Sequence, residues 1–373
     1  MCTIGELITK VGSGVTPRGG EAVYKTEGHP FVRSQNVGLG NLLLDDIAFI
    51  DEETHLRQKN TELQFNDVLL NITGASIGRS ALVDKQIVGG NVNQHVCIIR
   101  TKENLVPSFI CSFLLSNYGQ RQIDSFQAGG NRQGLNFEQI KSIKITIPSK
   151  DEQIKIAKLL RAIDERIATQ NKIIDKLQSL IKGIAQNVAR NNKPNIRLSE
   201  CLECSSSTLQ ESDVCKNGTY PVYGANGIVG YLDNYNTEKE AVYIIKDGSG
   251  VGTVSYVTGK CSATGTLNTL QAKEGYSLQY LYYMLKVFNF EPYKTGMAIP
   301  HIYFKDYGKA KIFCPSYTEQ LKYARLLSAI DNKLSAEQSI LTDLSLQKQY
   351  LKVCRNTRCA FFFSLTIKIG SFF

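Results

Sequence analysis

Long apolar runs are missing from this chain of 373 residues, and their absence argues against a membrane-spanning helix. No window reaches the roughly 18 continuous apolar residues that a membrane-spanning helix needs. A secretory signal peptide, with a charged start followed by an apolar stretch, is missing as well. The ten cysteines are irregularly spaced and several lie inside apolar runs, which favours reduced thiols over disulfides. We therefore expect a cytoplasmic protein with no membrane partner.

Signatures of catalysis are equally scarce. Only four histidines occur, His29, His55, His95 and His301, and their spacing fits neither a metal site nor a catalytic triad. The chain has no Walker loop, no Asn/Asp-Pro-Pro-aromatic motif of adenine methyltransferases and no carboxylate–lysine cluster of a nuclease. We therefore expect no catalytic residue, no metal ion and no cofactor in this chain.

Two short motifs have alternative interpretations. The glycines of DGSGVG, residues 247–252, could cradle a phosphate, but the segment continues into another strand-like stretch instead of a helix. A hairpin turn is the better interpretation. Cys201 and Cys204, with Cys215 and Cys261 as further ligands, could bind zinc, but the spacing fits no paired zinc knuckle and no histidine is near.

What the chain has instead is a heptad pattern between residues 151 and 190. Apolar side chains recur there in steps of four and three, and proline is absent, which predicts one helix about 60 Å long. Gln170 is the interruption of the apolar seam. The seam residues are Ile156, Leu160, Ile163, Ile167, Ile174, Leu177, Ile181, Ile184 and Val188.

The same helix returns near the C-terminus. Pro315 stands 167 residues after Pro148, and the two segments align from there without a gap. Glu337 takes the place of Gln170, and Lys348 adds a second interruption. The second seam comprises Tyr323, Leu327, Ile330, Leu334, Leu341, Leu344 and Leu351. A repeat this long indicates a duplicated module made of one globular head and one long helix.

The heads align only in pattern. Short runs rich in Val, Ile and Leu alternate with glycine turns, which predicts small curved sheets. Buried helices are predicted over residues 105–126 and 277–288. The expected domains are residues 1–147 (first head), 148–190 (first long helix), 191–314 (second head), 315–352 (second long helix) and 353–373 (an atypical apolar tail).

A net charge of +9 suits a polyanionic partner. Loops of both heads carry side chains that read base edges or hold phosphates. The candidates of the first head are Arg18, Arg33, Ser34, Gln35, Asn36, Arg79, Asn91, Asn93, Gln94, His95, Asn131, Arg132 and Gln133. Those of the second are Lys246, Ser249, Lys260, Thr264, Asn268, Lys294, His301, Tyr303 and Lys305. We expect double-stranded DNA as the ligand.

Residues 1 to about 352 resemble the DNA-specificity subunit of type I restriction-modification systems. The resemblance rests on the duplicated entry to the helix, IPSKDEQIKIAKLLRAIDERI and CPSYTEQLKYARLLSAIDNKL, and on GGNRQGLNFEQIKSIKITIP before the first copy. It implies an α+β fold with two mostly-β target-recognition domains, two long antiparallel coiled-coil helices and an internal pseudo-two-fold repeat. Each head would read half of an asymmetric bipartite site.

The resemblance also implies partners. The long helices would pack together and dock two methyltransferase subunits, which restriction (translocase) subunits join. S-adenosylmethionine, ATP and Mg²⁺ would belong to those partners. The residues expected to pack and dock are Ile156, Leu160, Ile163, Ile167, Tyr323, Leu327, Ile330 and Leu334.

Two departures from this pattern stand out. The chain reaches GELITKVGSG almost at once, so we expect the strand that usually precedes this segment to be missing. After Leu351 the heptad is lost and an apolar tail follows, which we expect to lie outside both cores. Two alternatives remain open, a coiled-coil scaffold for other proteins and an enzyme with an undetected site. Salt-sensitive binding to duplex DNA would argue against the scaffold, and a test of the isolated chain for methyl transfer or cleavage would decide the enzyme alternative.

Overall fold

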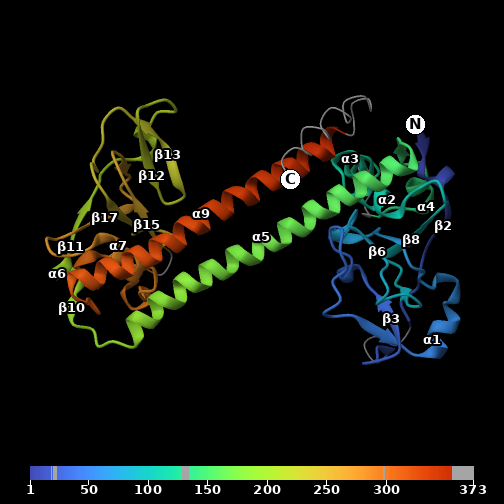
Figure 1. The fold of residues 1–373 in the computed structure, drawn as a ribbon, viewed down its shortest axis with the longest axis horizontal. Helices are drawn as coiled ribbons and strands as arrows, with labels where there is room; N and C mark the ends of the chain where they lie inside the picture. Colours follow the sequence, from blue (N-terminus) through green and yellow to red (C-terminus); the bar gives the residue numbers. More distant parts are fainter. Residues whose placement is uncertain (18, 20–22, 128–133, 297–298, 355–373) are drawn as a thin grey trace. The chain divides into compact units, whose positions relative to one another are not determined.

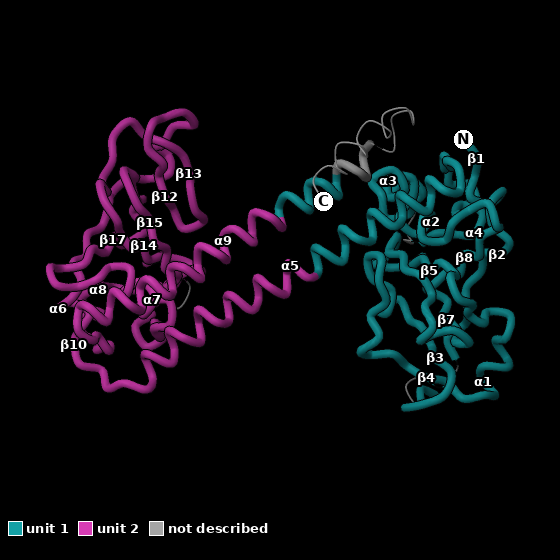
Figure 2. Tube along the Cα trace, viewed as in Figure 1, with its two compact units in different colours: residues 1–168, 342–373 teal, residues 169–341 magenta. Residues whose placement is uncertain are grey.

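The computed structural model describes residues 1–17, 19, 23–127, 134–296 and 299–354 (Figure 1). The chain divides into two compact units, Met1–Ala168 with Thr342–Phe373, and Thr169–Leu341 (Figure 2). Each unit therefore holds one head and parts of both long helices. None of the described helices is long and apolar enough to cross a membrane. The expected tail lies almost wholly outside the described residues, because it includes 355–373.

The head of unit 1 contains two small sheets. The first has the strand order β2-β8-β5-β6 and is antiparallel, and the second has the order β4-β3-β7 with a parallel β3–β7 pair. The strands are β1 (Cys2–Thr3), β2 (Ile8–Ser13), β3 (His29–Val32), β4 (Ala48–Ile50), β5 (Val68–Asn71), β6 (Ser80–Leu82), β7 (Asn91–Val92), β8 (Val96–Thr101) and β9 (Lys144–Ile145).

Both faces of the β5–β8 pair are buried, which explains the unbroken apolar runs of these strands. Successive side chains of a strand point to opposite faces. Val68 and Leu70 accordingly pack into a core with the helices that cover one face, whereas Leu69 packs into a second core on the other face. The helices are α1 (Glu52–Arg57), α2 (Pro107–Leu114), α3 (Asn117–Ser125), α4 (Phe137–Ser142) and α5 (Lys150–Arg190), with short 3₁₀ turns at Ile4–Leu7, Ser34–Asn36, Lys59–Thr61 and Gly74–Ser76.

One helix predicted over 105–126 is in fact two, α2 and α3. The Ser116 hydroxyl caps the start of α3 by accepting a hydrogen bond from the Gly119 N–H at 3.2 Å. Gly119 also lies against the Phe113 carbonyl oxygen, where a side-chain Cβ would come within 2.4 Å. The single-helix prediction was wrong because a serine cap and a glycine contact outweigh continuous hydrophobicity.

The head of unit 2 repeats this topology strand for strand. Its sheets have the orders β11-β17-β14-β15 and β13-β12-β16, again with one parallel pair, β12–β16. The strands are β10 (Ile196–Arg197), β11 (Leu202–Ser206), β12 (Tyr220–Gly224), β13 (Gly227–Leu232), β14 (Ala241–Ile245), β15 (Val254–Val257), β16 (Ser262–Ala263), β17 (Leu267–Ala272) and β18 (Lys311–Ile312). The helices are α6 (Leu198–Cys201), α7 (Leu278–Lys286), α8 (Phe304–Tyr307) and α9 (Tyr317–Cys354), with 3₁₀ turns at Glu211–Asp213 and Glu291–Tyr293.

The short strand before each head is present in both units. β10 pairs antiparallel with β18, and β1 pairs in the same way with β9, directly before the long helix. The expectation that the first head lacks this strand was therefore wrong. A two-residue strand has too little pattern to be recognised from sequence, and only its distant partner identifies it.

The long helices run antiparallel within unit 2. The end of α5 lies beside the start of α9, where the Asn195 N–H donates to the Ile312 carbonyl at 3.0 Å, and Gln170 contacts Glu337 farther along both helices. The α+β fold with two mostly-β heads and two long antiparallel helices is confirmed. The seam residues Leu327 and Leu334 are buried, and Tyr323 and Ile330 are partly buried.

In unit 1, the seam residues of α5 form a small cluster of their own. Leu160 and Ile163 are buried, and Ile156 and Ile167 pack against them. Lys348, the second interruption of the α9 seam, forms an ion pair with Asp164 of α5. The charge of Lys348 is therefore paired within unit 1.

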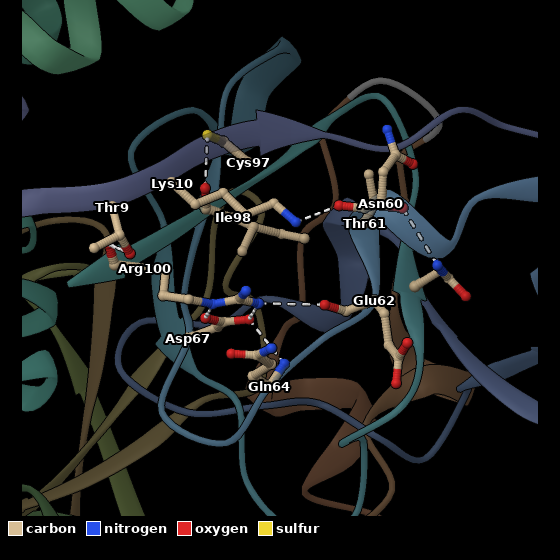
Figure 3. A network of polar contacts seen from close by, with 11 residues as sticks. Thr9, Lys10, Asn60, Thr61, Glu62, Gln64, Asp67, Cys97, Ile98 and Arg100 are labelled. Carbon is tan, nitrogen blue, oxygen red and sulfur yellow. Dashed lines mark hydrogen bonds and ion pairs between the residues drawn. The ribbon is translucent and has the colours of Figure 1, made fainter. Parts of the chain in front are cut away.

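A buried ion pair fixes the loop between α1 and β5 to the first sheet (Figure 3). The Arg100 guanidinium donates two hydrogen bonds of 2.7 Å to the carboxylate of Asp67, which is only 1% exposed. The same carboxylate accepts the Gln64 N–H at 2.8 Å. Lys10 of β2 donates to the Asn60 carbonyl of the same loop. These contacts tie residues 60–67 to β2 and β8.

A glutamine at the start of each long helix joins that helix to its head. Gln153 accepts the Val106 N–H at 2.8 Å at the start of α2 and donates to the Pro148 carbonyl at 3.0 Å. Gln320 makes the equivalent bonds, with the Ser277 N–H at the start of α7 and the Pro315 carbonyl, both at 2.9 Å. The repeated Pro-Ser-x-x-Glu-Gln motif therefore encodes one attachment, used twice.

Replacing Gln153 or Gln320 with alanine leaves a buried backbone N–H without its partner. We expect each variant to lose about 1–3 kcal/mol of unfolding free energy. Denaturant unfolding measures this loss, with Gln178→Ala on the exposed face of α5 as the control. Equal stability of all three variants would contradict the attachment.

Candidate nucleic-acid interface

The turn between β5 and β6, residues 72–79, is the first part of the candidate interface. Gly74 and Gly78 take positive φ angles of 71° and 84°, which glycine adopts without strain. The Leu135 N–H donates to the Ile72 carbonyl at 2.8 Å, and Thr73 bridges to Gly134. The turn is thereby held against the segment that leads into α4.

The turn between β14 and β15, residues 246–253, repeats this geometry. Gly248 and Gly252 have φ angles of 94° and 90°. The Ile302 N–H donates to the Lys246 carbonyl at 2.9 Å, and Asp247 bridges to His301. DGSGVG is therefore the predicted hairpin turn, because it joins two paired antiparallel strands.

Equivalent positions of the two turns carry different side chains. Thr73 corresponds to Asp247, and the exposed Arg79 corresponds to Thr253. The Thr73 hydroxyl and His95 Nδ1 share a hydrogen bond of 2.5 Å. In the second head, His301 Nδ1 and the Asp247 carboxylate share one of 2.7 Å. The two turns thus share a backbone conformation but present different hydrogen-bonding groups.

Most candidates of the first head fall into three groups. Gln35, Arg79 and Gln94 are exposed. Asn36 and Asn93 are buried, and Asn36 donates to the Leu43 carbonyl at 2.9 Å, so both serve the loop structure. Arg18, Asn131, Arg132 and Gln133 lie outside the described residues.

Arg33 and Asn91 are also engaged within the head. The Arg33 guanidinium donates to the Asp46 carbonyl at 2.7 Å and lies over the Tyr24 ring. Asn91 is fully buried and donates to the Gln58 carbonyl at 2.9 Å. Polar composition alone does not separate such loop-building residues from residues available to a ligand.

Several candidates of the second head come together around its turn. Lys246 and Ser249 belong to the turn, and the bridge from Asp247 brings His301 beside them. Tyr303 and Lys305 follow directly, with the Lys305 ammonium 5.2 Å from the centre of the exposed Tyr303 ring.

The other candidates lie apart from this group or are buried. Thr264 and Asn268 are buried, and Asn268 bonds Ser206 and Tyr307. Lys294 lines a cavity of about 420 Å³ and pairs with Glu291 at 2.6 Å.

Lys260 lies on an aromatic pair that sequence reasoning missed. Its ammonium is 4.7 Å from the centre of the Tyr235 ring and 5.9 Å from that of Tyr220. Contact with the Tyr235 hydroxyl raises the pKa of Lys260. The tyrosines of TYPVYG and YLDNYN, on either side of one hairpin, were the available signal.

The zinc alternative gains no support from the described residues. Among them, no three His, Cys, Asp or Glu side chains gather closely enough to hold a metal ion. Burial raises the pKa of the Cys201 thiol to about 12.

The fold and its two equivalent turns define a class of protein, a tandem duplication that presents two different polar surfaces on one scaffold. A family model described as the type I restriction modification DNA specificity domain matches residues 1–179 and 194–345. The chain belongs to this family, and it is a non-catalytic specificity subunit of a type I restriction-modification system.

Relatives agree with this assignment. A putative type I specificity subunit of Mycoplasma genitalium is 25% identical over 315 residues, covering 77% of this chain and 80% of that protein. The EcoprrI specificity subunit of Escherichia coli is 28% identical over 112 residues, 30% of this chain and 28% of that one. The crystal structure of an S subunit from M. genitalium superposes with a TM-score of 0.68 at 18% identity, covering 94% of each chain.

Two polar residues of the first head should respond differently to substitution, one in DNA binding and the other in stability. Arg79→Ala removes an exposed guanidinium, so we expect weaker duplex DNA binding, with a smaller salt dependence, at an unchanged melting temperature. Asn36→Ala removes buried hydrogen bonds, so we expect a lower melting temperature. Salt-dependent binding and thermal unfolding measure both effects. Unaltered DNA binding by Arg79→Ala would remove this turn from the interface.

Proposed function

We propose that this specificity subunit reads an asymmetric bipartite site in double-stranded DNA, one half-site with each head. The observation that carries the proposal is the pair of equivalent turns, whose backbones agree while their side chains differ. Base edges are read by side-chain hydrogen bonds, so different side chains on one turn select different bases. The net charge of +9 adds attraction to the phosphates.

We further propose that the long helices dock two modification subunits. On both helices, three exposed positions point away from the seam, since about 100° of rotation per residue places them on one side. We call them the outward face: Lys155, Lys158 and Ala162 on α5, and Lys322, Arg325 and Ala329 on α9. These residues are exposed, so core packing does not explain why they are similar in both repeats. Docking of two copies of the same partner, one on each helix, does explain it.

The docking surface assigned from sequence thereby changes. Because Leu160, Ile163, Leu327 and Leu334 are buried within their units, we propose that they hold the helices together and that the outward face contacts the partner. In this proposal the modification subunits bind S-adenosylmethionine, and restriction subunits that join them use ATP and Mg²⁺. The complex works in the cytoplasm on the host genome.

Charge reversal on the outward face tests docking. We expect Lys158→Glu combined with Arg325→Glu to abolish co-purification with the modification subunits of the same system while the melting temperature stays unchanged. Lys182→Glu is the matched control, because this exposed lysine has Gln349 as its counterpart in the other repeat. By contrast, Ile163→Asp with Ile330→Asp should lower stability and assembly together. Retained assembly in the Lys158→Glu/Arg325→Glu variant refutes docking on this face.

A second experiment tests whether the helices set the distance between half-sites. Inserting four residues at the same point of α5 and α9 adds about 6 Å to each helix and slightly more than one full turn. The bases modified in each half-site should stay the same, and the unspecified gap should grow by nearly two base pairs of about 3.4 Å. Sequencing of the modified sites gives the answer. Changed half-site bases with an unchanged gap would show that the helices do not set the distance between the half-sites.

A further inference from the structure

The polar interruption of the seam consists of two residues that occupy the same position in the two repeats. Gln170 and Glu337 are 167 residues apart, the period of the duplication, and they contact each other within unit 2. Gln170 Nε2 donates to the Glu337 backbone carbonyl at 3.0 Å and to its carboxylate. Both residues are only 6% exposed. The polar position of one repeat therefore contacts the polar position of the other.

The apolar part of the seam does not decide which helices pair. Ile163, Ile174 and Leu177 of α5 correspond to Ile330, Leu341 and Leu344 of α9, so both helices present similar apolar surfaces. The ion pair between Lys348 and Asp164 does not decide it either. Asp331 is the counterpart of Asp164, and a second copy of α9 would offer Lys348 the same carboxylate.

Hydrogen-bonding capacity separates the possible pairs at the polar position. A glutamine amide both donates and accepts, whereas an ionised glutamate only accepts. Two α5 helices would bring two amides together, which can bond each other. Two α9 helices would bring two carboxylates together, each bound by Lys333 of its own helix but with no amide to bridge them, and like charges at close range repel.

The charge on Glu337 is maintained by its surroundings. Lys333 lies one turn away on the same helix with its ammonium 2.5 Å from the carboxylate. The hydrogen bonds from Lys333 and Gln170 lower the pKa of Glu337. The carboxylate is therefore ionised at neutral pH, and the repulsion between two copies of α9 is present under cellular conditions.

We propose that Gln170 and Glu337 are the pairing determinant of the seam, so that α9 accepts α5 of its own chain and rejects a second copy of α9. The determinant goes beyond DNA reading and partner docking, because it controls which helices of this duplicated chain associate. It disfavours the joining of two subunits through their α9 helices, which the apolar seam alone would allow.

The test uses full-length chains mixed in ¹⁴N- and ¹⁵N-labelled forms, refolded together and treated with a lysine-specific crosslinker. A mass-labelled link between Lys333 of two chains reports contact between two α9 helices. We expect Glu337→Gln to increase this link about tenfold or more over the unaltered chain, because the like-charge repulsion is gone. Gln178→Glu, a matched change on the exposed face of α5, should leave the link unaltered.

The exchanged variant Gln170→Glu/Glu337→Gln keeps the test decisive if a single variant folds poorly. Gln170→Glu alone places two carboxylates in the seam, so its melting temperature should fall, and the exchange should restore it. In the exchanged chain, links between two Lys333 side chains should rise, and those between two Lys172 side chains of neighbouring chains should fall. Equal Lys333 links in the unaltered, Glu337→Gln and exchanged chains, or failure of the exchange to restore the melting temperature, overturns the proposal.

Discussion

The attachment of each long helix to its head is the constraint on which the rest of the structure depends. A helix positions a recognition surface only if its first turn is fixed to that surface. Gln153 and Gln320 fix it by hydrogen bonds to the backbone at the start of a buried head helix. Ser149 and Glu152, and likewise Ser316 and Glu319, cap the helix at the same point. The two attachments are alike although the heads around them have diverged.

Much of the fold followed from the sequence where the signal was local and repeated. The heptad and the gapless duplication predicted both long helices and the two-head organisation, because period and length are visible without any tertiary contact. The heads were predicted only as small curved sheets. Their shared strand order depends on pairings such as β2–β8 and β11–β17, between segments far apart in the chain.

The candidate interface was predictable to a smaller extent. Residue type identified Arg79, Lys246 and His301, which lie on or beside the equivalent turns. It also selected Asn36, Thr264 and Asn268, which are buried, because loop-building and ligand-binding residues share the same polar chemistry. Only burial and hydrogen-bond partners separate the two. The polar interruption of the seam was visible in the sequence, but that its two members contact each other required the structure.

The central claim is that this chain chooses the DNA sites of a type I system by reading two different half-sites. Genome-wide mapping of modified adenines in host cells with and without this chain tests it most directly. The account predicts one asymmetric motif, two specified parts separated by an unspecified gap, that disappears when the chain is deleted. A motif that persists without the chain, or one that is continuous or palindromic, would contradict the account.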